Sequence, residues 1–202
     1  IVTKHADLDK ATDGVMRSAF GFGGQKCSAN SRVYVEREVY DDFDAQLKDK
    51  TEKIKVGNPL ERDVYLGPLI NEKQMKSVLG YVETGVGEGA TLVTGGKRQP
   101  VNGRGYFVQP TVLSGVHNGM RVAQEEIFGP VLAVIPFDRE ARHRIFELTR
   151  GVPRRINLLC DRALLGDYAS GRQRVDRAIV EKAANEVFDR RDGGAWRPTG
   201  KA

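Results

Sequence analysis

The residue types best suited to covalent chemistry lie in a glycine-rich segment near the start of this 202-residue chain. The segment runs Phe20-Gly21-Phe22-Gly23-Gly24-Gln25-Lys26-Cys27-Ser28 and carries one thiol, at Cys27. Glycine permits positive φ and close backbone approach, so N–H groups at such a bend can face a developing negative charge. Lys26 or a nearby helix N-terminus would lower the pKa of the thiol and supply thiolate. The pattern therefore predicts a covalent nucleophile, although residue type alone favours a buried structural cysteine.

A second segment that is relevant to the candidate chemistry lies about a hundred residues downstream, at Glu125-Glu126-Ile127-Phe128-Gly129-Pro130-Val131. Together the two segments resemble the aldehyde dehydrogenase superfamily, over about residues 1–138. The resemblance implies that Cys27 attacks an aldehyde to give a thiohemiacetal, that hydride passes to NAD, and that water hydrolyses the thioester. It also implies that Glu126 hydrogen-bonds the nicotinamide ribose and that Phe128 packs beside the nicotinamide.

The residues on either side of the thiol are most similar to those of the 1-pyrroline-5-carboxylate (glutamate semialdehyde) dehydrogenases. This resemblance rests on Lys26 and Ser28 and implies that Ser28 contacts the substrate, a small-molecule aldehyde such as glutamate 5-semialdehyde. The family's glycine-rich cofactor segment and general-base glutamate have no match in the chain, which also lacks an initiator methionine. We therefore expect a catalytic-domain fragment that is inactive by itself.

Helical and strand patterns alternate around these segments. Apolar residues at helical spacing predict a helix that Asp7 caps and the glycines at 21–24 end. Alternation of β-branched and aromatic residues predicts a strand at 31–35, and an apolar run predicts a buried strand at 131–137. The expected fold class is α/β, an aldehyde dehydrogenase catalytic-domain-like layer with a mainly parallel sheet, followed by a small all-α segment. Exposed sheet edges would favour homo-oligomers or other association.

Two further helices are expected between these strands. One carries Val39, Phe43 and Leu47 and should end near Gly57. The other should begin at a capping box, in which Asn71 and Gln74 satisfy each other's backbone N–H groups.

Charge and residue type change sharply after Asp138. Residues 1–138 contain 17 basic and 18 acidic side chains, whereas residues 139–202 contain 15 basic and 9 acidic ones, with arginine replacing lysine as the main cation. Such a shift indicates two pieces of different origin. We expect a dehydrogenase fragment at 1–138, a helical segment at 139–190 and a flexible tail at 191–202.

The segment at about 140–190 resembles the helical lid of an AAA+ ATPase of the general secretion pathway A type. Its helices should break at Gly151-Val152-Pro153, and Asp176 should cap the last of them. The resemblance implies that Arg154 senses the nucleotide, so a nucleotide-responsive interaction module is the alternative function. No phosphate-binding Gly-x-x-x-x-Gly-Lys-[Ser/Thr] loop is present in the sequence.

The sequence disfavours several other classes of protein and of binding site. No apolar run is long enough to span a membrane, and the N-terminus lacks the pattern of a signal peptide. Two distant cysteines and three scattered histidines match neither a disulfide framework nor a metal site, so a reducing, cytoplasmic location is expected. Cys160 lies in a leucine-rich stripe typical of a packed, inert thiol. Acidic residues among the C-terminal arginines favour a solvated face over nucleic-acid binding.

Overall fold

The computed structural model describes residues 1–169 and 177–188. The chain divides into two compact units, Ile1–Pro136 and Phe137–Ala202, which are taken separately below.

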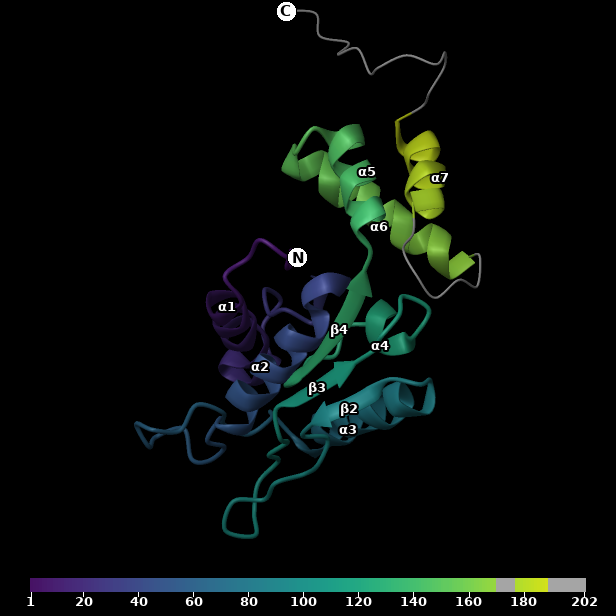
Figure 1. Cartoon of the computed structure of the whole chain (residues 1–202). Helices are drawn as coiled ribbons and strands as arrows, with labels where there is room; N and C mark the ends of the chain where they lie inside the picture. Colours follow the sequence, from purple (N-terminus) through teal and green to yellow (C-terminus); the bar gives the residue numbers. More distant parts are fainter. Residues whose placement is uncertain (170–176, 189–202) are drawn as a thin grey trace, which may run out of the picture. The chain divides into compact units, whose positions relative to one another are not determined.

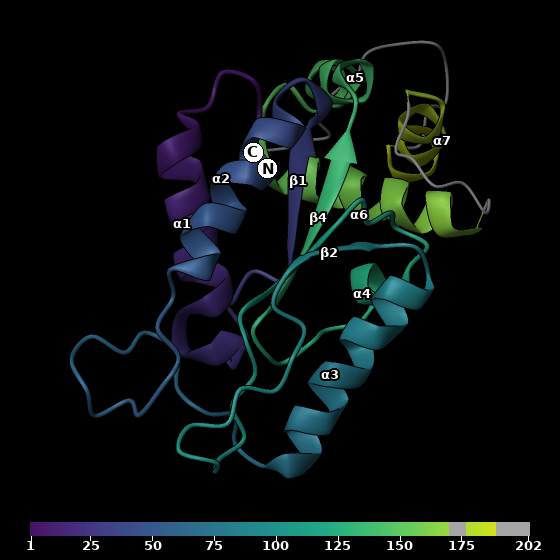
Figure 2. The same cartoon turned by 60° about the horizontal axis from the view of Figure 1, so that its bottom comes forward.

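A four-stranded sheet forms the centre of the first unit, in the order β1-β4-β3-β2. Figure 1 shows β2, β3 and β4, and Figure 2 shows β1 next to β4. The strands are β1 (Arg32–Glu36), β2 (Thr91–Thr94), β3 (Thr111–Ser114) and β4 (Val131–Phe137). β3 and β4 run parallel, while β2 pairs antiparallel with β3 at the edge. The mostly parallel sheet and the α/β class confirm the expected fold class.

Both faces of β4 are buried, which explains its continuous apolar sequence. Successive side chains of a strand point to opposite faces, so Leu132 and Val134 enter one core and their neighbours enter the other. Helices α1 (Leu8–Phe20) and α2 (Tyr40–Glu52) cover the first of these faces, and α3 (Glu72–Gly87) covers the second (Figure 2). The sheet is therefore the middle layer of three.

The expected helix boundaries are partly correct. The Asp7 side chain accepts a hydrogen bond from the Lys10 N–H at 3.2 Å, so it caps α1 as predicted. α2 ends at Glu52, earlier than the expected Gly57, because the chain turns there to form a short parallel bridge between Val56 and Leu66. The short helix α4 (Arg121–Gln124) has no counterpart in the sequence predictions.

Only half of the expected capping box at α3 forms. The Asn71 side chain accepts a hydrogen bond from the Gln74 N–H at 2.8 Å, as a capping residue should. Among the described residues the Asn71 N–H makes no hydrogen bond to the Gln74 Oε1, and the Gln74 Nε2 donates to the carbonyl of Phe128 at 2.8 Å. The prediction was wrong on this bond, and the bond made instead connects α3 to the second segment of interest.

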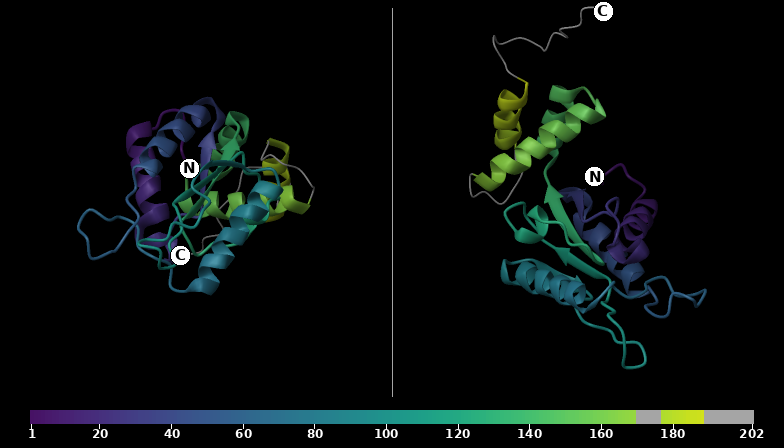
Figure 3. Two further views of the ribbon diagram at one scale, coloured as in Figure 1. Left: turned by 90° about the horizontal axis from the view of Figure 1, so that it is seen from below. Right: turned by 180° about the vertical axis from the view of Figure 1, so that it is seen from behind.

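Three helices that pack against one another make up the described part of the second unit (Figure 3). They are α5 (Arg139–Thr149), α6 (Pro153–Ala169) and α7 (Arg177–Val187). Left-handed residues at Arg150 and Gly151 end α5, and Pro153 begins α6, where the sequence predicted the break. Their shared core consists of Leu159, Ala163, Ile179, Val180, Ala183 and Ala184. Asp176 and the expected tail at 191–202 lie outside the described residues.

Candidate active site

The glycine-rich segment forms a tight bend directly after α1. Phe22, Gly23 and Gly24 adopt left-handed φ values of 58°, 70° and 66° in succession. For a bulky residue such as Phe22 this conformation is rare, and such outliers are often found at functional sites. The bend reverses the chain and brings the thiol out of the helical layer.

Cys27 occupies the tip of the turn that follows. The Ala29 N–H donates to the Lys26 carbonyl at 3.0 Å, which closes a turn with Cys27 and Ser28 at its two central positions. Both central side chains are exposed. The backbone N–H of Cys27 makes no hydrogen bond to any residue that the structure describes. The turn thus presents a thiol and an unused backbone donor together.

The two segments singled out in the sequence are in direct contact. A Cβ atom placed on Gly24 would lie 2.1 Å from the carbonyl oxygen of Gly129, a distance that no side chain tolerates. Gly129 is equally confined, because a Cβ there would lie 2.4 Å from a methyl carbon of Val78 on α3. Glycine at both positions lets the Cys27 loop lie flat against the 125–131 segment.

Two glutamine side chains fix the loop from either side. The Gln25 Oε1 accepts a hydrogen bond from the Ile70 N–H at 3.0 Å, and its Nε2 lies 3.5 Å from the Pro68 carbonyl. Gln74, as described above, holds the carbonyl of Phe128. The connection before α3 therefore holds the nucleophile loop, and the first turn of α3 holds the downstream segment.

Glu126 and Phe128 both lie exposed on this downstream segment. Phe128 is 40% exposed, and Glu126 forms no ion pair with any described residue. A free carboxylate and an open aromatic face are groups that suit a ribose hydroxyl and a flat heterocycle.

Comparison with known proteins identifies the family. A model of the "Aldehyde dehydrogenase family" matches residues 1–144. The chain belongs to the aldehyde dehydrogenase family. This confirms the family-level prediction made from the two sequence segments.

Relatives from several branches of the aldehyde dehydrogenases are similar to the chain. It is 46% identical over 142 residues to a betaine aldehyde dehydrogenase of Sinorhizobium fredii, which covers 70% of this chain and 29% of that protein. It is 43% identical over 136 residues to a malonate-semialdehyde dehydrogenase of Bacillus pumilus, covering 67% of this chain and 28% of the relative. The chain thus spans less than a third of the length of these curated relatives.

Solved structures show the same similarity. The Thermus 1-pyrroline-5-carboxylate dehydrogenase with bound NAD matches with a TM-score of 0.65 and 43% identity, over 71% of this chain and 27% of that one. The Staphylococcus aureus betaine aldehyde dehydrogenase in complex with NAD+ matches with a TM-score of 0.67 and 35% identity, over 71% of this chain and 29% of that one.

A charged cluster that the sequence analysis missed holds the start of the 125–131 segment. Arg121 donates two hydrogen bonds to the Glu125 carboxylate, both at 3.0 Å, and the Tyr81 hydroxyl donates a third at 2.5 Å. The hydrogen bonds from Arg121, which have the larger effect, and the one from Tyr81 lower the pKa of Glu125 to about 2. Glu125 is therefore anchored as a carboxylate, and its neighbour Glu126 is left free. The i, i+4 spacing of Arg121 and Glu125 was the available sequence signal.

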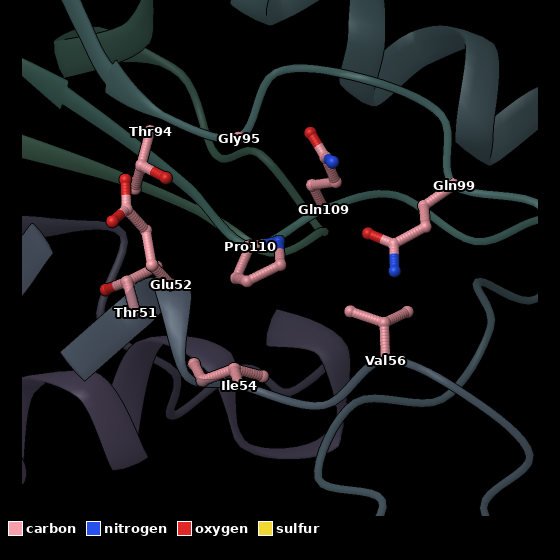
Figure 4. A pocket seen from close by; sticks show the side chains of 9 residues that line it. All are labelled: Thr51, Glu52, Ile54, Val56, Thr94, Gly95, Gln99, Gln109 and Pro110. Atoms are coloured by element: carbon pink, nitrogen blue, oxygen red, sulfur yellow. The ribbon is translucent and has the colours of Figure 1, made fainter. Parts of the chain in front are cut away.

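The hollow shown in Figure 4 lies away from the candidate site residues. Its volume is about 140 Å³, and its lining includes Thr51, Ile54, Gln99, Gln109 and Pro110. None of these residues belongs to the Cys27 loop or to the 125–131 segment.

The other residues considered from sequence belong to the second unit. Cys160 is partly exposed on α6, so it is less fully packed than predicted. Arg154 is exposed in the first turn of α6, and its nucleotide-sensing role, like the lid resemblance of the second unit, stays a prediction.

Within residues 1–169 and 177–188 no helix has the length and apolar character to cross a bilayer. In the same residues no group of three or more His, Cys, Asp or Glu side chains is arranged to hold a metal ion.

Proposed function

We propose that residues 1–138 are the nucleophile-bearing part of an NAD-dependent aldehyde dehydrogenase that oxidises an aldehyde to the carboxylate. The observation that carries this proposal is the contact of Gly24 with Gly129, because it brings the loop of Cys27 against the segment of Glu126 and Phe128. Nucleophile and cofactor-binding groups must be neighbours for hydride to leave the carbon that the thiol has attacked.

In the proposed reaction the Cys27 thiolate attacks the aldehyde carbon and forms a thiohemiacetal. The oxygen gains negative charge in this step, and the unused backbone N–H of Cys27 is available to donate to it. Ser28 is exposed at the adjacent turn position, and we infer that it contacts the substrate chain. Loss of hydride from the attacked carbon to the bound cofactor, and of the proton from its oxygen, would leave a thioester. Water then hydrolyses this thioester, which releases the carboxylate and frees the Cys27 thiol.

The described residues fit NAD as the cofactor. The exposed Glu126 carboxylate would accept hydrogen bonds from the nicotinamide ribose, and the exposed Phe128 ring would pack beside the nicotinamide. When bound, NAD supplies the hydride acceptor. The contribution of this chain is to hold the carboxylate and the ring on a segment that Gln74 and Arg121 anchor.

Glutamate 5-semialdehyde is the substrate that we favour, on the strength of Lys26 and Ser28 beside the nucleophile. The curated relatives are named for betaine aldehyde and malonate semialdehyde, so the family accepts both cationic and anionic aldehydes. A reducing, cytoplasmic location and association between copies through the edge strand β2 belong to the same proposal.

A chimera tests this function directly. Residues 1–138 would replace the matching segment of the Thermus 1-pyrroline-5-carboxylate dehydrogenase, and NAD reduction would be followed with glutamate semialdehyde. We expect the chimera to turn over and its Cys27→Ser variant to be inactive. The 202-residue chain by itself should show little activity, since general-base catalysis alone typically contributes ~10²–10⁴-fold. A folded chimera with no activity contradicts the proposal.

A further inference from the structure

Two Asn-Gly pairs occur in the chain, and the structure gives them opposite surroundings. They are Asn102-Gly103 and Asn118-Gly119, both in the first unit. Asparagine followed by glycine is well suited to spontaneous deamidation, because glycine has no side chain to hinder its backbone nitrogen from attacking the preceding side-chain amide. The reaction needs an asparagine side chain that is free to move and a glycine N–H that is free of hydrogen bonds.

The first pair forms the tip of the hairpin that connects β2 to β3 (Figure 1). The Val101 N–H donates to the Arg104 carbonyl and the Arg104 N–H donates back to the Val101 carbonyl, both at 3.0 Å. Between them Asn102 and Gly103 have left-handed φ values of 51° and 74°. Positive φ at both central residues is the pattern of a type I′ hairpin turn.

The reacting groups at this tip are open to solvent. Asn102 and Gly103 are both exposed. Neither the Asn102 side chain nor the Gly103 N–H forms a hydrogen bond with any residue that the structure describes. A Cβ atom placed on Gly103 would meet no atom within 4 Å. The side-chain amide and the backbone nitrogen that would attack it are therefore both available for reaction.

The second pair is held in place by hydrogen bonds and burial. Asn118 is 2% exposed, and its Oδ1 accepts a hydrogen bond from the Tyr34 hydroxyl at 3.3 Å. The Gly119 N–H donates to the Nδ1 of His117 at 3.2 Å. The Gln124 amide also donates to the Asn118 carbonyl. Attack at Asn118 thus requires several hydrogen bonds to break and a buried side chain to move.

We propose that Asn102 is a site of spontaneous deamidation in the folded chain and that Asn118 is protected from the same reaction. The backbone nitrogen of Gly103 gives up its proton and bonds to the side-chain carbonyl carbon of Asn102. The amide nitrogen takes up a proton and leaves as ammonia, so a cyclic succinimide forms with no net change in protons. Water then adds to either ring carbonyl and opens the ring to aspartate or isoaspartate. The inference does not depend on the proposed function.

The product changes both the charge and the backbone path of the hairpin tip. Residues 97–109 contain three basic side chains, at Lys97, Arg98 and Arg104, and no acidic one. Deamidation therefore introduces the first carboxylate of this segment, close in the chain to Arg104. In the isoaspartate product the backbone runs through the former side chain and gains one methylene. The paired hydrogen bonds between Val101 and Arg104 then no longer match a two-residue turn.

Incubation of the full chain at neutral pH and peptide mass mapping test the site. The measurement follows the replacement of an amide by a carboxyl group at Asn102 and at Asn118. The same measurement on the chain unfolded in urea gives the intrinsic rate of each pair, and the ratio of folded to unfolded rates isolates the effect of structure. We expect Asn102 to react more slowly when folded than in urea, because the turn must open, but loop tips open at low cost.

The ratio should be at least about tenfold higher at Asn102 than at Asn118, since each factor of ten corresponds to ~1.4 kcal/mol of the opening free energy that the buried pair requires. Isoaspartate should appear together with aspartate at position 102, and the rate should rise with pH as the Gly103 nitrogen loses its proton more readily. Asn102→Gln should suppress the reaction there, because its longer side chain must close a larger ring. Equal ratios at the two sites, no reaction at Asn102 in the folded chain, or aspartate as its sole product would overturn the proposal.

Discussion

The replacement Gly24→Ala tests whether the contact between the nucleophile loop and the downstream segment is as tight as the structure indicates. The new methyl carbon would lie 2.1 Å from the Gly129 carbonyl oxygen and 2.6 Å from its carbon. Both neighbours are backbone atoms, which cannot move aside as a flexible side chain would. The loop and the segment must separate for the alanine to fit.

The expected cost has two parts. A non-glycine residue at φ +66° costs roughly 1–2 kcal/mol, and forcing an extra carbon into a packed contact costs about 1–3 kcal/mol. Together they predict that Gly24→Ala lowers the free energy of unfolding by about 2–5 kcal/mol. Gly115 is a matched control, because its φ is also +66° and a Cβ there would meet no atom within 4 Å. Gly115→Ala should therefore cost only about 1–2 kcal/mol.

Hydrogen exchange provides the assay, since it reports on the first unit alone. Mass spectrometry of the peptide that covers Val131–Phe137 measures the opening free energy of the buried strand β4 in each variant. Gly14→Ala serves as a second control in the interior of α1, where the alanine meets nothing and should stabilise by about 0.5–1 kcal/mol. If Gly24→Ala destabilised no more than Gly115→Ala, the close contact with Gly129 would be refuted.

Three further predictions concern the same unit and its thiol. Iodoacetamide at neutral pH should label Cys27 faster than Cys160, because Cys27 is exposed and Cys160 is partly buried; mass mapping that shows the reverse order would contradict the assignment. Asn71→Ala should destabilise α3 by about 0.5–2 kcal/mol in urea unfolding, through loss of its cap, and an unchanged midpoint would count against that cap. The pKa of Glu125 is lowered from 4.5 to about 2, so its stabilising effect is present above pH 4.5 and is lost as the pH falls toward 2. The stability difference between the wild-type chain and Glu125→Gln should shrink over that interval, and a difference that did not depend on pH would exclude the ionised cluster.

Local patterns in the sequence were sufficient to predict much of the first unit. The apolar run of β4 and the cap at Asp7 depend on residues close in the chain, and the structure places both as expected. The break between α5 and α6 at Gly151 follows equally from backbone preferences.

Contacts between distant residues could not be predicted in the same way. The capping box at Asn71 was plausible locally, but the Gln74 amide bonds the carbonyl of Phe128, 54 residues away. The position of Tyr65 above Gly21 has no local signature either, since it depends on how the connection after α2 folds over the loop. Such features depend on tertiary packing, which periodicity does not report.

The turn at the thiol has a consequence for how the proposed enzyme would acquire new substrates. Its closing hydrogen bond joins two backbone groups, the Ala29 N–H and the Lys26 carbonyl, and uses neither of the exposed side chains beside Cys27. The residues at positions 26 and 28 are therefore free to vary without loosening the nucleophile. A library of the proposed chimera, randomised at these two positions, should remain folded almost throughout while its preference among aldehydes diverges. Substitutions at positions 26 and 28 are equally open to evolution, which is consistent with relatives that are named for different aldehydes.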